Sequence, residues 1–194
     1  MEDTIVAIAT PPGQGAVSLI RISGNESVQV ANKVFKCNKL DWLSVPRTQC
    51  FGGIYNSESE KVDSVLTTFF KGPNSYTGDD VIEIACHGGM LITQKVLETI
   101  IEAGARLAEP GEFSKRAFLN GKMDLTQAEG LADLIDAPTQ QAARQATASL
   151  QGAFSDAVNK ISQRVIDLRI YVEAAIDFPE EEVDFLSEGR VTTS

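Results

Sequence analysis

The chain has 194 residues, of which 43% are hydrophobic and 23% charged, as in an ordinary globular protein with one good core or a domain and an appendage. Its formal net charge of −10 argues against a nucleic-acid-binding face built from bulk positive charge, because phosphate contacts rely on clustered Lys and Arg. Three widely spaced cysteines match no metal-ligand spacing, and no apolar run reaches the length of about 18 residues that marks a membrane helix, so we expect a reducing compartment and neither secretion nor a membrane span.

Four strands and one short helix are expected in the first 70 residues. Apolar residues alternate with polar ones, and Gly, Pro or short polar segments separate the runs. Asn25 or Ser27 is the expected cap of the helix. The strands are predicted at residues 4–9, 16–24, 47–55 and 62–70, the helix at 25–35, and a polar hairpin at 56–60.

Arg21 lies in phase with Val17 and Leu19 in the second of these strands. An arginine on a face with apolar neighbours is either an edge residue that extends its charge to water or the partner of a buried anion or carboxylate. The sequence alone leaves both interpretations open.

The central stretch joins a turn-prone loop at 71–80, a strand at 81–85 and an amphipathic helix at 90–101. Alternation places Glu83 on the strand face opposite Ile82 and Ile84. Glu83 is therefore either a solvated edge carboxylate or an acceptor for the amino and ring N–H groups of a ligand. His87, the one histidine of the chain, precedes a Gly pair and is expected to be a hydrogen-bonded structural residue.

A basic stretch at 114–125 follows a short strand at 105–108 and a turn at 109–113. Asn120 and Gly121 form a helix-terminating pair that would hold Lys122 in a fixed position. The stretch is either a solvated basic face or a site where Arg116 and Lys122 hold an acidic ligand. Five or six strands with two or three helices on one side predict an α+β domain that ends near residue 120.

Helix-forming residues dominate from Thr126 onward. Thr126 and Glu129 form a capping-box pattern for a helix through residue 137. Residues 139–178 contain no proline and a single glycine, which allows one helix of about 60 Å. A heptad seam in this helix needs facing helices that the sequence does not supply; it consists of Phe154, Val158, Ile161, Val165, Leu168, Val172 and Ala175.

Ten short runs carry a resemblance to a known family. They are DTIVA at 3–7, TPPG at 10–13, RISG at 21–24, PNSYTG at 73–78, HGG at 87–89, PGEF at 110–113, RAFLN at 116–120, DLTQAE at 124–129, DLIDA at 133–137 and EAAIDFPEE at 173–181. Over its whole length the chain resembles the N-terminal part of the MnmE (TrmE) family of tRNA-modification GTPases.

This resemblance implies a fold and a set of partners. The fold would be an α+β domain with a mixed or antiparallel sheet, like the folate-binding module of aminomethyltransferases, at residues 1–120. An all-α segment with one long helix would follow at 121–194. The family is expected to be cytoplasmic and homodimeric, and to act with the flavin-dependent protein MnmG on C5 of the wobble uridine of tRNA.

The resemblance also implies a ligand, 5-formyl- or 5,10-methylene-tetrahydrofolate, with Arg21, Glu83 and Lys122 on the family's folate-contact positions. No catalytic or metal-binding residue is expected in this chain. The sequence lacks the phosphate-loop pattern G-x-x-x-x-G-K-S/T, so GTP, potassium and magnesium would bind in a GTPase domain that it does not contain. We therefore expect folate binding and dimerisation without GTP hydrolysis. The alternatives are a folate-dependent one-carbon transferase that acts alone and a dimerisation scaffold with a vestigial pocket.

Overall fold

The computed structural model describes residues 3–37 and 42–177. The chain divides into two units, the first ending at Asp124 and the second beginning at Leu125. Each unit has its own set of packed elements, and each is described by itself.

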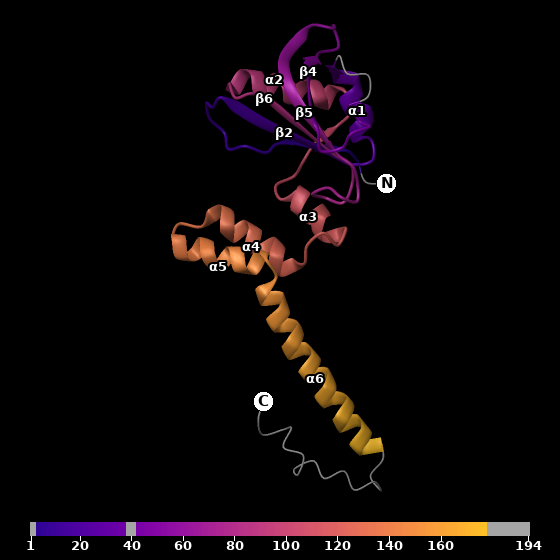
Figure 1. Ribbon diagram of the computed structural model, residues 1–194, viewed down its shortest axis with the longest axis vertical. Helices are drawn as coiled ribbons and strands as arrows, with labels where there is room; N and C mark the ends of the chain where they lie inside the picture. The colour runs from indigo at the N-terminus through magenta and orange to yellow at the C-terminus, as the bar shows by residue number, and fades with distance from the viewer. Residues whose placement is uncertain (1–2, 38–41, 178–194) are drawn as a thin grey trace. The chain divides into compact units, whose positions relative to one another are not determined.

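The first unit is built on a seven-stranded mixed sheet with the order β3-β4-β5-β6-β2-β1-β7 (Figure 1). Neighbouring strands are antiparallel except β1 and β7, which pair in parallel. The strands are β1 (Ile5–Ile8), β2 (Val17–Ser23), β3 (Phe35–Cys37), β4 (Gln49–Tyr55), β5 (Lys61–Phe70), β6 (Val81–His87) and β7 (Arg106–Leu107). Three helices belong to this unit, α1 (Ser27–Val34), α2 (Met90–Glu102) and α3 (Glu112–Leu119).

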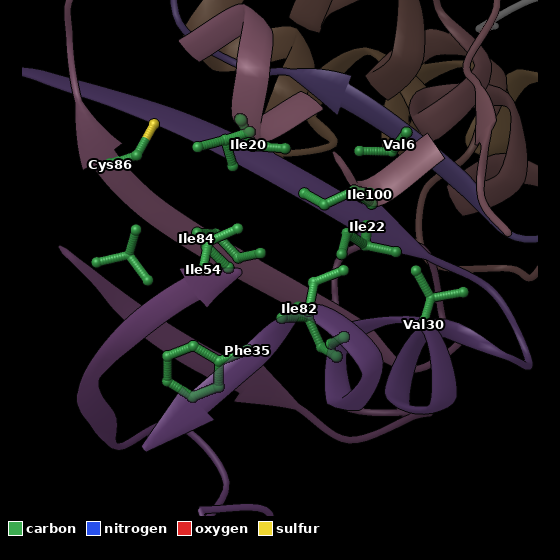
Figure 2. Close-up of a cluster of buried hydrophobic side chains, with 14 of the residues drawn as sticks. Val6, Ile20, Ile22, Val30, Phe35, Ile54, Ile82, Ile84, Cys86 and Ile100 are labelled. Atoms are coloured by element: carbon green, nitrogen blue, oxygen red, sulfur yellow. The ribbon is translucent and has the colours of Figure 1, made fainter. Parts of the chain in front are cut away.

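The core lies between one face of the sheet and helices α1 and α2 (Figure 2). Alternation in β2 and β6 directs four isoleucines to this face, and all four are fully buried: Ile20, Ile22, Ile82 and Ile84. In α2 the buried positions recur at steps of three or four, because one helix face meets the sheet. Each buried isoleucine contributes about 1.5–3 kcal/mol relative to an exposed one.

The opposite face of the sheet carries the residues of β2 and β6 that alternate with the four buried isoleucines. One end holds Arg21 and Glu83, and the loop before β6 covers it. The other end is apolar and open, and its members Phe51, Leu66, Ala85 and Leu19 form one continuous row across β4, β5, β6 and β2. Phe51 is 68% exposed and Leu66 is 39% exposed. We refer to these four residues as the open-face row.

The α+β class and the mixed sheet predicted from the sequence are confirmed, with three local differences. The strand Phe35–Cys37 was not predicted. Strand β4 begins at Gln49 rather than at Arg47, because Arg47 has φ of 64°, outside the extended region. Neither Asn25 nor Ser27 caps α1; Glu26 occupies that position without a side-chain cap, and the Ser27 hydroxyl donates instead to the Asp80 carbonyl.

Between residues 125 and 177, the described part of the second unit contains three helices, α4 (Leu125–Asp136), α5 (Gln140–Leu150) and α6 (Ala153–Asp177). Helices α4 and α5 pack side by side as an antiparallel hairpin (Figure 1). Gly130 of α4 is buried against α5, where an added Cβ would lie 3.0 Å from Ser149 Cβ. The missing side chain therefore permits the close approach of the two helices.

The single helix expected over 139–178 is wrong, because the chain breaks between α5 and α6. Gly152 has φ of 90°, a left-handed conformation that ends α5 before α6 begins. With 25 residues, α6 is about 38 Å long. Thr126 does not cap α4 as expected. Helix α4 already begins at Leu125, the residue before Thr126, and the Thr126 hydroxyl bonds to the Ser155 hydroxyl.

The predicted heptad seam lies on α6, and its described members are exposed within this chain. Phe154 and Ile161 are more than half exposed, and Val158, Val165, Leu168 and Val172 are also exposed. The side chain of Ala175, the last predicted member, lies outside the described residues. These residues form a long apolar stripe, and a heptad seam of this kind is where facing helices pack.

Candidate ligand-binding site

Arg21 of β2 and Glu83 of β6 lie directly opposite each other in the antiparallel pair. Arg21 Nε and Nη2 donate to the same carboxylate oxygen, Glu83 Oε1, at 2.9 and 2.6 Å. Both side chains are 23% exposed. Of the two possibilities for Arg21, the carboxylate partner is the one found, and Glu83 lies on a central strand rather than at a solvated edge.

Two aromatic rings surround the Arg21 guanidinium. Its carbon lies 4.8 Å from the centre of the Tyr76 ring and 5.8 Å from that of Phe113. Such contacts favour the cation and fix its orientation. With Arg21 held on one side, Glu83 Oε2 is left without a hydrogen-bond donor among the residues that the structure describes. This oxygen can accept from a ligand.

The loop of residues 71–80 is fastened to the sheet and to α3. The Thr77 hydroxyl lies 2.7 Å from the buried Ser23 hydroxyl of β2. Tyr76 Oη lies 3.0 Å from Ser114 Oγ, and Asn120 Nδ2 donates to the Thr77 carbonyl at 2.8 Å. The loop therefore presents Tyr76 over the Arg21 and Glu83 pair in a defined position.

Lys122 is placed by the end of α3, as the sequence predicted. Gly121 adopts a left-handed φ of 66°, its N–H donates to the Phe118 carbonyl, and the Lys122 N–H donates to the Ala117 carbonyl. These two bonds form a Schellman termination. The Lys122 ammonium then donates to the Pro73 carbonyl at 2.9 Å.

A cavity of about 370 Å³ connects these parts, within the range of about 300–1,000 Å³ that is usual for small-molecule sites. Glu83 and Lys122 both line it, whereas Arg21 does not line it and lies behind Glu83 and Tyr76. The inner end is formed by the buried or half-buried Phe70, Val81 and Glu83, and the exposed rim by Arg47, Asn74 and Lys122. Ser75 and Tyr76 complete the wall.

Arg47, Tyr76 and Phe113 were not singled out from the sequence. The motif PNSYTG drew attention to the loop around Tyr76, but no pattern indicated which ring would meet Arg21. Arg47 was assigned to a strand, and its left-handed backbone has no sequence signal in an arginine.

Arg116 does not line the cavity, so the expectation that it holds an acidic ligand with Lys122 is wrong. It is 4% exposed and donates to the Asp3 carbonyl and to the carboxylates of Asp3 and Glu112. Arg106 bonds the same two carboxylates. Chiefly through the hydrogen bonds from Arg106, the pKa of Asp3 and the pKa of Glu112 are each lowered to about 2, and the pKa of Arg106 is raised.

His87 is hydrogen-bonded, as expected. Its Nδ1 lies 2.7 Å from Asp63 Oδ1, and its backbone N–H donates to Asp63 Oδ2 at 2.9 Å. The ring is 69% exposed and lies at the end of β6, outside the cavity.

Over the described ranges, 3–37 and 42–177, no cluster of three or more His, Cys, Asp or Glu side chains could hold a metal ion. Within the same part of the chain, no helix combines the length and the apolar character that crossing a membrane requires.

Taken together, the sheet and the elements around it define an α+β domain with a cavity of the size usual for small-molecule sites, and a helical segment follows this domain. Residues 4–122 match the family profile described as the GTP-binding protein TrmE N-terminus, and residues 125–194 match the MnmE helical domain. The chain belongs to the TrmE (MnmE) family.

Curated relatives are similar to the chain over nearly its full length. The tRNA modification GTPase MnmE of Hydrogenovibrio crunogenus is 54% identical over 97% of this chain and 41% of the relative. Those of Legionella pneumophila strain Corby and Chromohalobacter salexigens are 52% and 50% identical over 98% of this chain, which corresponds to 42% and 40% of each relative. The chain thus spans about two fifths of the length of these relatives.

Proposed function

We propose that this chain is the N-terminal, tetrahydrofolate-binding and dimerising part of a GTPase that modifies C5 of the wobble uridine of tRNA together with MnmG. One observation carries the proposal: Glu83 is held by Arg21 through one oxygen only, in a cavity of suitable size, and offers its second oxygen to a ligand.

The residues present fit a tetrahydrofolate. The amino and ring N–H groups of a pterin are donors, and Oε2 of the half-buried Glu83 carboxylate is a strong acceptor for them. Tyr76 offers a ring face beside that carboxylate, and the Lys122 ammonium at the rim suits the carboxylates at the other end of the ligand. When bound, 5-formyl- or 5,10-methylene-tetrahydrofolate would supply a one-carbon unit, and the chain would bind and orient it.

The same domain is proposed to form a homodimer. The open-face row crosses four adjacent strands, with Phe51 and Leu66 exposed and Ala85 and Leu19 half-buried, and no charged residue interrupts it. An exposed apolar sheet surface favours burial against another sheet. A second copy would present an identical row, so a twofold arrangement would bury both.

We assign GTP hydrolysis, together with the potassium and magnesium that it needs, to the part of the relatives that lies outside their match to this chain. The name of the relatives includes a GTPase activity, and the present sequence contains no phosphate-loop pattern. We propose a cytoplasmic complex in which this chain provides the folate and dimer contacts, with MnmG and tRNA bound by the complete assembly.

Calorimetry with 5-formyltetrahydrofolate tests the folate proposal. The 194-residue chain should bind it with a stoichiometry of one per chain, whereas p-aminobenzoylglutamate, which lacks the pterin, should bind far more weakly. Absence of measurable binding would favour the alternative of a scaffold with a vestigial pocket. Catalysis of one-carbon transfer by the chain alone, without MnmG, would favour the stand-alone transferase.

A further inference from the structure

A second cavity, of about 480 Å³, adjoins the rim of the first. Arg47 and Asn74 line both cavities, so the two cavities adjoin at these residues, and we refer to them together as the depression. Pro46, Lys71 and Gly72 complete the second wall. The depression therefore runs from Glu83 at its inner end, past Arg47, to Lys71.

Arg47 is fixed at the junction by its backbone. Its φ of 64° is uncommon for a residue with a side chain, and strained positions of this kind gather at functional sites. The Arg47 N–H donates to the Phe69 carbonyl at 2.7 Å, which holds the residue against the end of β5. Its Nη2 donates to the Asn74 carbonyl at 2.9 Å, which directs the guanidinium along the shared wall.

The charge of the depression changes along its length. Its inner end contains the Glu83 carboxylate, whereas Arg47, Lys71 and Lys122 surround its outer part. Among the described residues, no acidic side chain lines the second cavity. The chain as a whole has a net charge of −10, so an anionic ligand is attracted only within a short distance of these cations. At physiological salt this distance is about 8 Å.

We propose that the second cavity binds the γ-linked polyglutamate tail of a polyglutamylated folate. This inference rests on the proposed function, because it extends the same ligand beyond the first cavity. Each added γ-linked glutamate carries one further carboxylate. Arg47 presents a planar fork of donors suited to a carboxylate, and Lys71 presents a compact charge one step further along the wall.

The ratio of the affinities for two folates provides the test, since it cancels any loss that a variant causes in the first cavity. Calorimetry compares the triglutamate and the monoglutamate of 5-formyltetrahydrofolate on the 194-residue chain. We expect the triglutamate to bind roughly tenfold more tightly at low salt, because its two further carboxylates form two exposed ion pairs whose binding free energies add. This ratio of affinities should fall as salt is added.

Arg47→Asn and Lys71→Gln should each reduce the ratio, and the double variant should bring it close to one. Asparagine is chosen at position 47 because it tolerates the left-handed backbone. The matched control is Lys95→Gln on α2, which removes an exposed cation from the helix that covers the other face of the sheet and should leave the ratio unchanged.

A ratio near one in the unmodified chain, or a ratio that both site variants leave intact, would overturn the assignment of the tail site while the folate site stands. Binding of neither folate would instead overturn the proposed function, and the tail site with it. The two failures are therefore distinguishable in one set of titrations.

Discussion

Arg21 and Glu83, 62 residues apart in sequence, face each other across β2 and β6, and two nitrogens of Arg21 converge on one oxygen of Glu83. The pair lies on the sheet face away from α1 and α2, under the loop of residues 71–80. Because one oxygen takes both bonds, the pair is a structural contact between strands that leaves Glu83 Oε2 for the proposed ligand.

A double-mutant cycle with Arg21→Gln and Glu83→Gln should give a coupling energy of about 1 kcal/mol in urea unfolding. This lies at the upper end of the values for exposed ion pairs, since both groups are largely shielded from water. Arg169 and Glu173, an exposed pair on α6, provide the matched control and should couple by about 0.5 kcal/mol or less. Equal coupling in the two cycles would show that shielding adds nothing to the Arg21 and Glu83 pair.

The Asp3, Arg106, Glu112 and Arg116 cluster predicts acid sensitivity of the first unit. Folding lowers the pKa of Asp3 from 3.8 and that of Glu112 from 4.5, each to about 2. A carboxyl group with a lowered pKa stabilises the folded state while it is ionised. Its contribution is therefore complete above about pH 4.5 and is lost as the pH falls toward 2.

Glu112→Gln tests this cluster. At pH 7 it should lower the free energy of unfolding by about 1–3 kcal/mol, because the buried Arg116 loses an ionised partner. At pH 2.5 the difference between the variant and the parent should shrink, because Glu112 is then almost fully protonated in the unfolded parent and begins to be protonated in the folded parent, so the ion pair contributes less to folding. A difference that stays constant from pH 7 to pH 2.5 would contradict the ion-pair account.

Gly130→Ala should loosen the contact between α4 and α5. At an exposed helical position this change stabilises by about 1 kcal/mol, but here the new Cβ would lie 3.0–3.2 Å from Ser149 Cβ, Leu150 N and Ala146 O. We expect backbone amides of α4 and α5 to exchange faster by about five- to fifty-fold, measured by mass spectrometry. Adding Ser149→Gly removes the nearest of these atoms and should recover part of the loss, whereas slower exchange in Gly130→Ala would argue against close packing.

The open-face row predicts which surface holds two copies together. Phe51→Asp places a charge on the most exposed member of the open-face row and should convert dimers to monomers at micromolar concentration, as measured by light scattering. Val165→Asp, on the exposed stripe of α6, is the matched control and should leave a dimer, as should the piece of residues 1–125. The reverse result would show that the long helices hold the copies together.

The sequence predicted most of the first unit because local patterns are sufficient there. Alternation in 16–24 placed Arg21 on the strand face that carries Val17 and Leu19, and alternation in 81–85 placed Glu83 on the face opposite Ile82 and Ile84. The Asn120 and Gly121 pair predicted the turn that positions Lys122. These signals depend only on neighbours along the chain. Sequence patterns could not show that Arg21 and Glu83 lie on adjacent strands, since register is a property of the whole sheet.

The failures have long-range or conformational causes. The basic stretch suggested a ligand partner for Arg116. Its pairing with Glu112, four residues earlier on α3, is a local pattern, but its other partner Asp3 lies 113 residues away and no local pattern indicates it. The left-handed backbone of Arg47 accompanies its bond to the Phe69 carbonyl, a contact distant in sequence, and arginine as a residue type does not predict it. The break at Gly152 was missed because one glycine within a helical pattern is compatible with both a continuous helix and a helix end.

The central claim is that Glu83 accepts hydrogen bonds from a bound tetrahydrofolate, and the affinity of Glu83→Ala for 5-formyltetrahydrofolate tests it most directly. Removal of the carboxylate leaves ligand donors unpaired in a partly dry cavity, which should weaken binding by about 1–3 kcal/mol, or roughly five- to 150-fold. Glu98→Ala, an exposed glutamate on α2, is the control of equal charge change and should bind as the parent does. An affinity of Glu83→Ala equal to that of the parent and of Glu98→Ala would contradict the account.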